Sequence, residues 1–311
     1  MNPPAQREVV AAVDLGGTRT KAALVDRSLG VVGRLVEPTP ANLGSGAGAG
    51  IGAGIGAAVA GVLARLTEAA PGMRVAGCGV VVPGLVDEAA GIGVLSVNHG
   101  WRDLPIRSAV SSSTGLPTAV GHDVRAGLVA EARLGAAVGA SDALFLPLGT
   151  GIAAALMVDG HVLQGGGWAG EVGHVSVDPS GPLCACGGVG CLEVIASASA
   201  VGREYSVRTG ESVDAKAVAE RVVAGDPVAV AVWDRAVGAL ARAIHETLTL
   251  TGIDLVVVGG GLAQSGELLL GPLRSELEAL RTFQRPARVV PAALGDWAGC
   301  LGAACLAWES S

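Results

Sequence analysis

Short apolar runs separated by glycine and other turn residues dominate the start of the chain. Residues 8–15 read EVVAAVDL and lead into a Gly-Gly-Thr turn, and two further apolar runs follow at 19–25 and 31–36. Runs of this length, each bounded by turn residues, predict three strands joined as a β-meander. The run 75–82, closed by Pro83 and Gly84, predicts another buried strand.

Two segments of this first half favour other structures. Residues 41–57 are rich in glycine and alanine, which predicts a flexible loop without a function of its own, and the loop passes into a helix that ends near residues 65–70. A second helix is predicted over 123–137, because an acidic residue, Asp123, suits the positive end of a helix dipole.

The strand–turn–strand pattern of the N-terminal part recurs later in the chain. Residues 143–162 read ALFLPLGTGIAAALMVDGHV, and residues 10–26 read VAAVDLGGTRTKAALVD. Both run from an apolar strand through a turn containing Gly-Thr into a second apolar strand that ends in Val-Asp. The repetition predicts a duplicated fold with two related lobes. A third glycine cluster, residues 259–261, follows a predicted strand at 253–258 and precedes a predicted helix.

Composition and charge limit the classes of function. The chain has 311 residues, of which 50% are hydrophobic, so two lobes are expected. The sequence contains no window of about 18 uninterrupted large apolar residues, so no membrane span is predicted. The N-terminal residues also lack the basic and apolar pattern expected of a leader peptide. The net charge of −7, without a Lys/Arg block, argues against a nucleic-acid partner. We therefore expect a cytoplasmic protein with neither membrane nor nucleic acid as a partner.

Three of the six cysteines fall within eight residues, at Cys184, Cys186 and Cys191, with His174 just upstream. Three thiolates and one imidazole can complete the tetrahedral shell that structural zinc prefers, whereas a disulfide or a chance cluster of buried cysteines are the alternatives. The spacing favours zinc. Two carboxylates, Glu171 and Glu193, flank the ligands, so the same loop is expected to position other polar groups. The remaining three cysteines stand singly in apolar contexts and are predicted core residues.

The glycine turns can bind phosphate. A strand followed by Gly16, Gly17 and Thr18 leaves backbone N–H groups free, Lys21 adds a positive charge, and Asp14 could hold a water on Mg²⁺. A tight hairpin explains one such turn equally well. The repeated units and the third glycine cluster together favour a nucleotide cleft, although neither a P-loop nor a dinucleotide fingerprint is present.

With these motifs the chain resembles the ROK family of sugar kinases, in the actin/hexokinase/Hsp70 ATPase superfamily. The resemblance runs from Val9 to about Ala307, nearly the whole chain. Its marks, of which the cysteine segment is the most specific, are Asp14-Leu-Gly-Gly-Thr-Arg-Thr-Lys21, Val82-Pro-Gly-Leu-Val-Asp87, Leu148-Gly-Thr-Gly-Ile152, Ala169-Gly-Glu-Val-Gly-His174, the segment from Cys184 to Glu193, Gly259-Gly-Gly261 and Gly295-Asp-Trp-Ala-Gly299.

The resemblance implies an α/β protein with a bilobal, actin-like (ribonuclease H-like) fold and a central cleft between related lobes. Residues 1–121, with a C-terminal helix at about 296–311, would form the small N-terminal lobe, and residues 122–295 the large lobe with a zinc-binding loop. ATP would bind between the lobes and the sugar deep in the cleft, with Mg²⁺ and structural Zn²⁺ as cofactors. A homodimer or homotetramer is expected.

The resemblance also implies roles for individual residues. Asp123 would be the general base that takes the proton of the sugar's 6-hydroxyl. The residues implied to contact the sugar are Asn98, His122, Asp123, Glu171, His174 and Glu193, with His174 also binding zinc through one nitrogen. The residues implied to bind ATP are Asp14, Gly16, Gly17, Thr18, Lys21, Gly149, Thr150, Gly151, Gly259, Gly260 and Gly261.

Three departures from the family pattern bear on the substrate. His122 stands where the family has an asparagine that touches the sugar's 3- and 4-hydroxyls, the family's Asn-Leu-x-x-Trp is here Asn98-His99-Gly100-Trp101, and Ala153 to Ala155 replace glycines after the second turn. Glucose remains the leading substrate. An amino sugar such as kanosamine or an N-acetylated hexosamine, or a cyclitol, is the alternative.

A non-catalytic sugar sensor is the remote alternative, which an intact Asp14, Lys21 and Asp123 argue against. A repressor of this family carries a helix-turn-helix domain before the first turn, and the thirteen residues that precede Asp14 are too few for one. The sequence leaves open whether ATP or polyphosphate is the donor.

Overall fold

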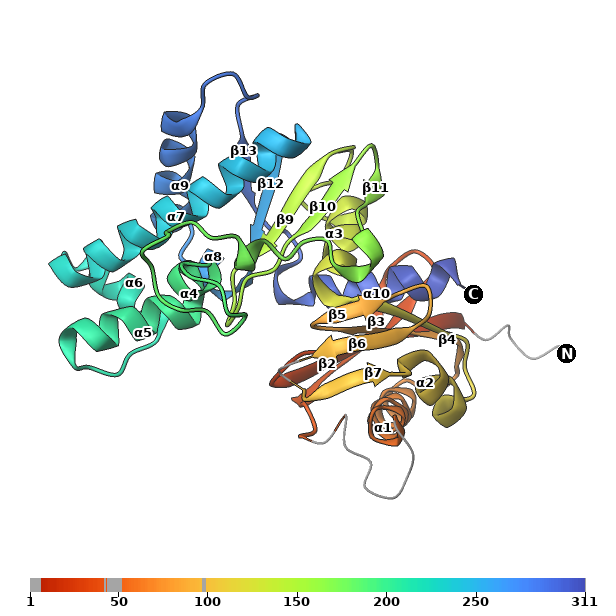
Figure 1. Ribbon diagram of the computed structural model, residues 1–311. Coiled ribbons are helices and arrows are strands. Elements are labelled where there is room, and N and C mark those ends of the chain that lie inside the picture. The colour runs from red at the N-terminus through yellow and green to blue at the C-terminus, as the bar shows by residue number, and fades with distance from the viewer. Residues whose placement is uncertain (1–6, 42, 44–51, 97–98, 311) are drawn as a thin grey trace, which may run out of the picture. The chain divides into compact units, whose positions relative to one another are not determined.

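The computed structural model describes residues 7–41, 43, 52–96 and 99–310 (Figure 1). The contacts within the chain define two compact units. Unit 1 comprises Met1–Ala130, Gln164–Trp168 and Trp297–Ser311, and unit 2 comprises Glu131–Leu163 and Ala169–Asp296.

The sheet of unit 1 contains the predicted meander. Its five strands lie in the order β3-β2-β1-β4-β8, with the first two pairs antiparallel and the last two parallel. The meander and the strand predicted at 75–82 are thereby confirmed. The strands are β1 (Arg7–Leu15), β2 (Arg19–Asp26), β3 (Val31–Pro38), β4 (Met73–Val82) and β8 (Thr118–His122). A smaller antiparallel sheet consists of β5 (Leu85–Asp87), β6 (Ile92–Ser96) and β7 (Trp101–Leu104).

Alternation along β1 places apolar side chains on both faces of this sheet. Val9, Ala11 and Val13 pack with α1 (Ala53–Ala69) and α2 (Ile106–Thr114). Val10 and Ala12 pack on the other face, against α10 (Ala298–Glu309). In Figure 1 the blue α10 lies beside the red and orange strands, although it is the last element of the chain. Strands β1, β2 and β4 are therefore covered on both faces, which explains why they read as continuous apolar runs.

The sheet of unit 2 repeats the topology of the first. Its order is β11-β10-β9-β12-β13, again with two antiparallel pairs followed by two parallel pairs. The duplication predicted from the repeated strand–turn–strand pattern is confirmed. The strands are β9 (Ala143–Pro147), β10 (Ala155–Val158), β11 (His161–Val162), β12 (Leu255–Gly259) and β13 (Arg288–Pro291).

Helices supply the rest of the core of unit 2. The longest, α7 (Pro227–Thr251), begins at the cap residue Asp226, whose side chain accepts the N–H groups of Val228 and Ala229. Its Trp233 and Leu240 pack in one cluster with strand residues such as Leu144. The other helices of this unit are α4 (Glu193–Ala196), α5 (Ala198–Thr209), α6 (Ala215–Val223), α8 (Gly260–Ala263) and α9 (Glu267–Leu280). Single 3₁₀ turns occur at Gly165–Gly167, Val172–His174 and Gly295–Trp297.

The helix predicted over 123–137 is α3 (Asp123–Leu134), which ends earlier than expected. The fully buried Glu131 accepts the N–H of Ala136 at 2.7 Å and that of Leu294 at 2.9 Å, so a carboxylate replaces the next helical hydrogen bonds. From the sequence, all of α3 was expected in the large lobe, which was predicted to begin at residue 122. Contacts group its first turns with unit 1, because Ala126 packs directly on Gly302 of α10.

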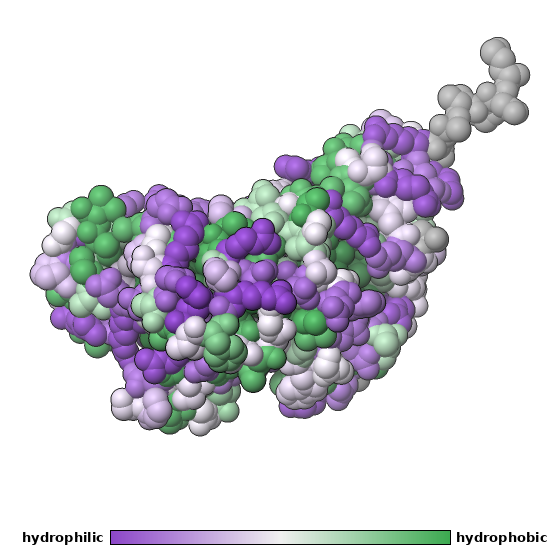
Figure 2. Space-filling model, turned by 90° about the horizontal axis from the view of Figure 1, so that it is seen from above, coloured by the Kyte–Doolittle hydropathy of each residue, from purple (hydrophilic) through white to green (hydrophobic). Residues whose placement is uncertain are grey.

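Among the residues that the structure describes, no helix is long and apolar enough to cross a membrane. The face of the molecule in Figure 2 mixes hydrophilic and hydrophobic residues. The cysteines predicted to be core residues, Cys78, Cys300 and Cys305, are buried as expected.

A close backbone contact between β4 and α10 gives a stability prediction. A Cβ added to Gly79 would lie 1.9 Å from the carbonyl oxygen of Ala303. We expect Gly79→Ala to lower the free energy of unfolding by about 1–3 kcal/mol, because helix and sheet must separate. Urea denaturation measures the change. The matched control is Gly33→Ala on β3, where no heavy atom lies within 4 Å of the new Cβ. Equal midpoints for the two variants would contradict the packing argument.

Candidate functional site

The first glycine turn, between β1 and β2, is held by one threonine. Thr39 donates its hydroxyl to the carbonyl oxygen of Gly16 at 2.7 Å and its N–H to that of Thr18 at 3.0 Å. Asp14 and Lys21 are cross-strand partners just before and after the turn. Gly17 and Thr18 are exposed at its tip. The turn therefore presents backbone N–H groups beside one carboxylate and one ammonium group, which suits a phosphate with its metal ion.

Asp14 lies next to the start of α3. A Cβ on Gly299 would be 3.0 Å from Oδ2 of Asp14 and 3.5 Å from the carbonyl oxygen of Asp123, so both acidic residues border this one glycine. The side chain of Asp123 is 27% exposed, and its Oδ1 accepts the N–H of Val124 at 2.8 Å. Unit 1 thus brings the predicted Mg²⁺ carboxylate and the predicted base into one neighbourhood.

His122 precedes Asp123 and is 4% exposed. Its Nδ1 accepts the N–H of Arg125 at 3.4 Å, and its Nε2 lies 3.5 Å from Oδ1 of Asp123. The imidazole therefore faces the carboxylate that follows it in the chain. Contact between His122 and a sugar stays a prediction, and Asn98, a further predicted sugar contact, lies outside the described residues.

Sequence reasoning did not assign a role to His99. Burial lowers the pKa of His99, while a hydrogen bond with the backbone of Leu15 and the charge of Asp123 act in the opposite direction. The ring stacks on Trp101, with centroids 4.5 Å apart and planes 5° from parallel. The departure from the family's Asn-Leu-x-x-Trp pattern was the signal that could have identified it.

In unit 2 the second glycine turn meets two other predicted segments. Oε2 of Glu193 accepts the N–H of Ile152 at 2.9 Å, directly after Gly149–Gly151. The N–H of Leu148 donates to the carbonyl oxygen of Gly259 at 2.8 Å. Gly260 has a φ of +81°, and a Cβ there would lie 2.4 Å from the carbonyl oxygen of Leu148. The structure therefore brings together the second turn, the third glycine cluster and the predicted sugar-binding Glu193.

The turn that carries Glu171 and His174 packs against Ile152 and Glu193. A Cβ on Gly173 would lie 2.1 Å from the carbonyl oxygen of Ile152 and 3.4 Å from Cβ of Glu193. The N–H of His174 donates to the carbonyl oxygen of Glu171 at 3.0 Å, which closes the turn. The three side chains predicted to contact sugar in unit 2 therefore arise from adjoining backbone.

The predicted zinc ligands converge. One ligand atom from each of His174, Cys184, Cys186 and Cys191 lies within 4.8 Å of all the others. Nδ1 of His174 is 3.7 Å from Sγ of Cys184, and the Sγ atoms of Cys186 and Cys191 are 3.6 Å apart. A disulfide requires about 2.05 Å, whereas sulfurs at ~2.3 Å from a tetrahedral zinc are spaced by ~3.8 Å. The donor set therefore fits zinc.

The thiols of Cys186 and Cys191 differ in their surroundings. The hydrogen bond from the N–H of Gly188 lowers the pKa of Cys186 to about 7. Burial raises the pKa of Cys191 to about 12. Zinc binds thiolates, so loading of this site requires the release of the proton of Cys191.

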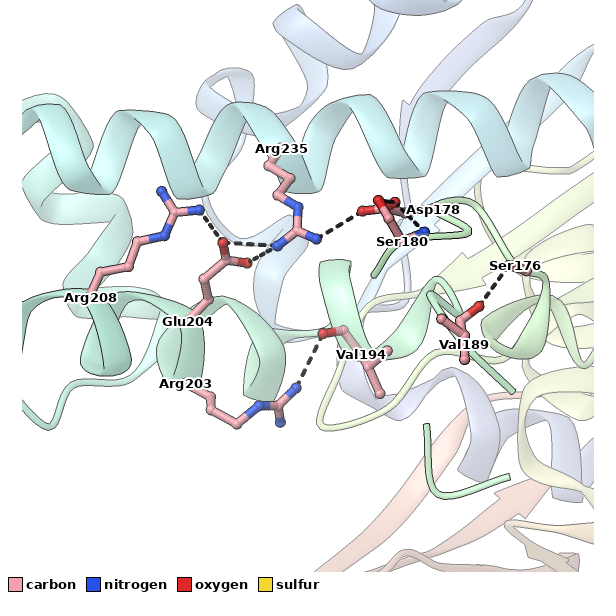
Figure 3. Close-up of polar contacts among 9 residues, drawn as sticks. All are labelled: Ser176, Asp178, Ser180, Val189, Val194, Arg203, Glu204, Arg208 and Arg235. Carbon is pink, nitrogen blue, oxygen red and sulfur yellow. Dashed lines mark hydrogen bonds and ion pairs between the residues drawn. The ribbon is translucent and has the colours of Figure 1, made fainter. Parts of the chain in front are cut away.

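An ion-pair network ties the segment between the ligands to the helices (Figure 3). Arg235 of α7 lies 3.1 Å from Oδ2 of Asp178 and 2.9 Å from Oε2 of Glu204 on α5. Arg203 donates to the carbonyl oxygen of Val194, the residue after Glu193, at 3.2 Å. Sequence reasoning missed these partners, because Asp178 and Arg235 are far apart in the chain and no local pattern marks either.

Comparisons with known proteins agree on one family. The model of the ROK family matches residues 10–310. The glucokinase of Thermotoga maritima is 31% identical over 317 residues, covering 96% of each chain. The N-acetylmannosamine kinase of Salmonella arizonae is 31% identical over 310 residues, covering 95% of this chain and 97% of the relative. The structure of a ROK family glucokinase from Streptomyces griseus, in complex with glucose and AMPPNP, superposes with a TM-score of 0.81 at 29% identity and covers 97% of this chain and 99% of that one.

The ion-pair network should affect the rate at which the zinc-binding loop, residues 174–191, releases its metal. We expect Arg235→Met to release zinc to a colorimetric chelator about two- to tenfold faster than the wild type, because partly exposed pairs each contribute roughly 0.2–1 kcal/mol. The loop would then open more often and expose its ligands.

Arg274→Met is the matched control, because Arg274 pairs with the exposed Glu267 on α9. Its release rate should equal that of the wild type. Cys191→Ala should fail to retain zinc at one ion per chain, as measured by plasma mass spectrometry. A wild-type protein without zinc after expression in zinc-supplemented medium would overturn the metal assignment.

Proposed function

The chain belongs to the ROK family and is a sugar kinase of the actin-like ATPase superfamily, and we propose that it transfers the γ-phosphoryl group of ATP to the 6-hydroxyl of glucose. The glucokinase relatives support glucose as the acceptor, and the AMPPNP complex of one of them supports ATP as the donor. Polyphosphate is the alternative donor.

One observation carries the proposal beyond the family relationship. The partly exposed carboxylate of Asp123 stands at the start of α3, and the backbone of Asp123 borders Gly299. Asp14 borders the same glycine and lies at the end of β1, the strand that enters the first glycine turn. Phosphoryl transfer requires a group that receives the hydroxyl proton and groups that position phosphate and metal. Unit 1 offers both kinds of group within one neighbourhood.

In the proposed reaction, Asp123 takes the proton of the 6-hydroxyl as the sugar oxygen attacks the γ-phosphorus. The bond from that phosphorus to the bridging oxygen breaks, and ADP leaves with the electron pair. Asp14 would hold Mg²⁺ through a water, and the ion when bound would supply positive charge that neutralises the phosphates. Lys21 and the backbone N–H groups of Gly16–Thr18 would orient the phosphates. The corresponding ATP contacts proposed in unit 2 are Gly149, Thr150, Gly151, Gly259, Gly260 and Gly261.

The sugar's other hydroxyls are assigned to Asn98 and to the adjoining residues of unit 2. Oε2 of Glu193 is engaged by Ile152, so Oε1 is the oxygen that we assign to the sugar. Nδ1 of His174 faces Cys184, which leaves Nε2 for the sugar when zinc is bound. Glu171 would accept a further hydroxyl. Zinc would keep the shape of the loop, and in this way it would support sugar binding without a part in the chemical step.

N-acetylmannosamine is the second candidate acceptor, because a relative named for that activity matches almost the whole chain at the same identity as the glucokinase. His122 and His99 change the polar groups near Asp123 compared with the family pattern, which also favours testing amino sugars. The expected homodimer or homotetramer stays a prediction.

A substrate panel tests the acceptor. We expect glucose to give a higher kcat/KM than N-acetylmannosamine, kanosamine or a cyclitol with Mg²⁺-ATP, and the product to carry phosphate at position 6 by NMR. A higher value for an amino sugar would replace glucose with that class. If none of these acceptors supports ADP formation, the result would favour a sugar sensor. Calorimetry with glucose would then report binding without turnover.

Asp123→Asn tests the base. The amide keeps the volume and one acceptor oxygen but cannot take the proton, so we expect kcat to fall by about 10²–10⁴-fold, with sugar affinity by calorimetry changed little. Asp159→Asn, at an exposed turn between β10 and β11, is the control and should retain wild-type kcat. A residual rate within about tenfold of the wild type would rule out Asp123 as the base.

A further inference from the structure

We propose that Glu88 and Arg125 form a positioning pair that, through His122, orients the carboxylate of Asp123 for proton transfer. The inference rests on the proposed role of Asp123 as the base. All four residues belong to unit 1. Neither Glu88 nor Arg125 lies in the motifs that suggested the function.

The pair is a buried ion pair. Nε of Arg125 donates to Oε1 of Glu88 at 2.7 Å, and the two side chains are 3% and 15% exposed. The two terminal nitrogens of the guanidinium reach the carbonyl oxygens of Gly167 at 3.4 Å and Val86 at 3.3 Å. A buried guanidinium needs this degree of pairing, because its desolvation is costly. Arg125, two residues after Asp123, is therefore fixed in one place.

Glu88 also holds the backbone in front of α3. Its Oε1 accepts the N–H of His122 at 3.2 Å, and its Oε2 accepts from the side chain of Gln164 at 3.2 Å. Oε1 of Glu88 therefore accepts from the backbone of His122, just before Asp123, and from the side chain of Arg125, two residues after it. The first turn of α3 is held on both sides of Asp123.

His122 passes this restraint to Asp123. The N–H of Arg125 donates to Nδ1 of His122, so in the neutral ring the proton is assigned to Nε2. Nε2 lies 3.5 Å from Oδ1 of Asp123. The ring therefore lies beside the carboxylate and limits the directions in which it can turn.

Other charges face Asp123 in the same unit. His99 interacts with its charge, and Asp14 lies across Gly299. Asp14 repels the carboxylate of Asp123, whereas an N–H at Nε2 of His122 attracts it. Loss of the imidazole should therefore let the carboxylate turn away from the hydroxyl and lower kcat.

This role differs from a sugar contact by His122. Nδ1 accepts the N–H of Arg125, and Nε2 lies 3.5 Å from Oδ1 of Asp123, all within unit 1. A hydroxyl would therefore have to share Nε2 with the carboxylate that it faces. The geometry therefore favours positioning of the base over recognition of the 3- and 4-positions.

The experiment compares Glu88→Gln with the double variant Glu88→Gln/Arg125→Met, using whichever acceptor the panel identifies. Glu88 lines a cavity of about 430 Å³ together with Arg107 and Gln164, so a glutamine amide has room there. The single variant leaves a buried guanidinium without its partner, and the double variant removes that charge. We expect Tm to fall in the single variant and to recover in the double variant.

A positioning role predicts that activity does not follow stability. In both variants kcat should fall about tenfold or more, and KM for sugar and ATP should stay within about twofold. Glu267→Gln, in an exposed pair with Arg274, should change none of these. Recovery of kcat together with Tm in the double variant would overturn the proposal, because it would show a structural role alone.

His122→Asn separates the two roles of the imidazole. A positioning residue should lower kcat while the ratio of kcat/KM for glucose and 3-substituted analogues stays constant. A changed ratio with unchanged kcat would overturn the proposal in favour of a sugar contact. Asp123→Asn is measured in parallel, since a high residual rate in that variant alone would reject the base itself rather than its positioning.

Discussion

Close approach of backbone to backbone at glycines is the constraint on which both units depend. At Gly79 the sheet of unit 1 touches α10, and at Gly260 the third glycine cluster touches the second turn. At Gly299 the carboxylate of Asp14 and the start of α3 border the same residue. In each case a Cβ would meet atoms of the neighbouring segment at 3.0 Å or less. The absence of a side chain is thus what allows the chemical groups to share one neighbourhood.

Carboxylates that accept backbone N–H groups fix these segments in place. Glu193 binds Ile152 after the second turn, Glu131 binds Leu294, and Glu88 binds His122. A carboxylate holds a backbone segment well for two reasons. It makes a stronger hydrogen bond than a carbonyl oxygen, and it can accept from other donors at the same time. Only Glu193 among these three also carries a proposed contact with substrate. Glu88 holds the backbone directly before Asp123, and Glu131 holds the turn that ends α3 together with the backbone before Gly295.

Local pattern was sufficient to predict the strands, the duplication and the cysteine cluster, because period, turn residues and ligand spacing are properties of neighbouring residues. Tertiary partners were not accessible in this way. Arg125 and Glu88 are 37 residues apart, and Arg235 and Asp178 are 57 apart, so no window contains both members of a pair. The end of α3 was misjudged for the same reason, since Glu131 finds Leu294 across 163 residues. The roles of individual site residues stay predictions.

The position of α10 has a consequence for biosynthesis. On the ribosome, β1 and β4 emerge early, whereas the helix that covers one of their faces emerges only after the whole of unit 2. Until then Val10, Ala12 and Val81 lack their native cover. Such a nascent chain exposes an apolar sheet surface for the time needed to translate well over a hundred further residues, at ~5–20 residues per second. The fold therefore makes unit 1, although it is translated first, the unit that completes its core last.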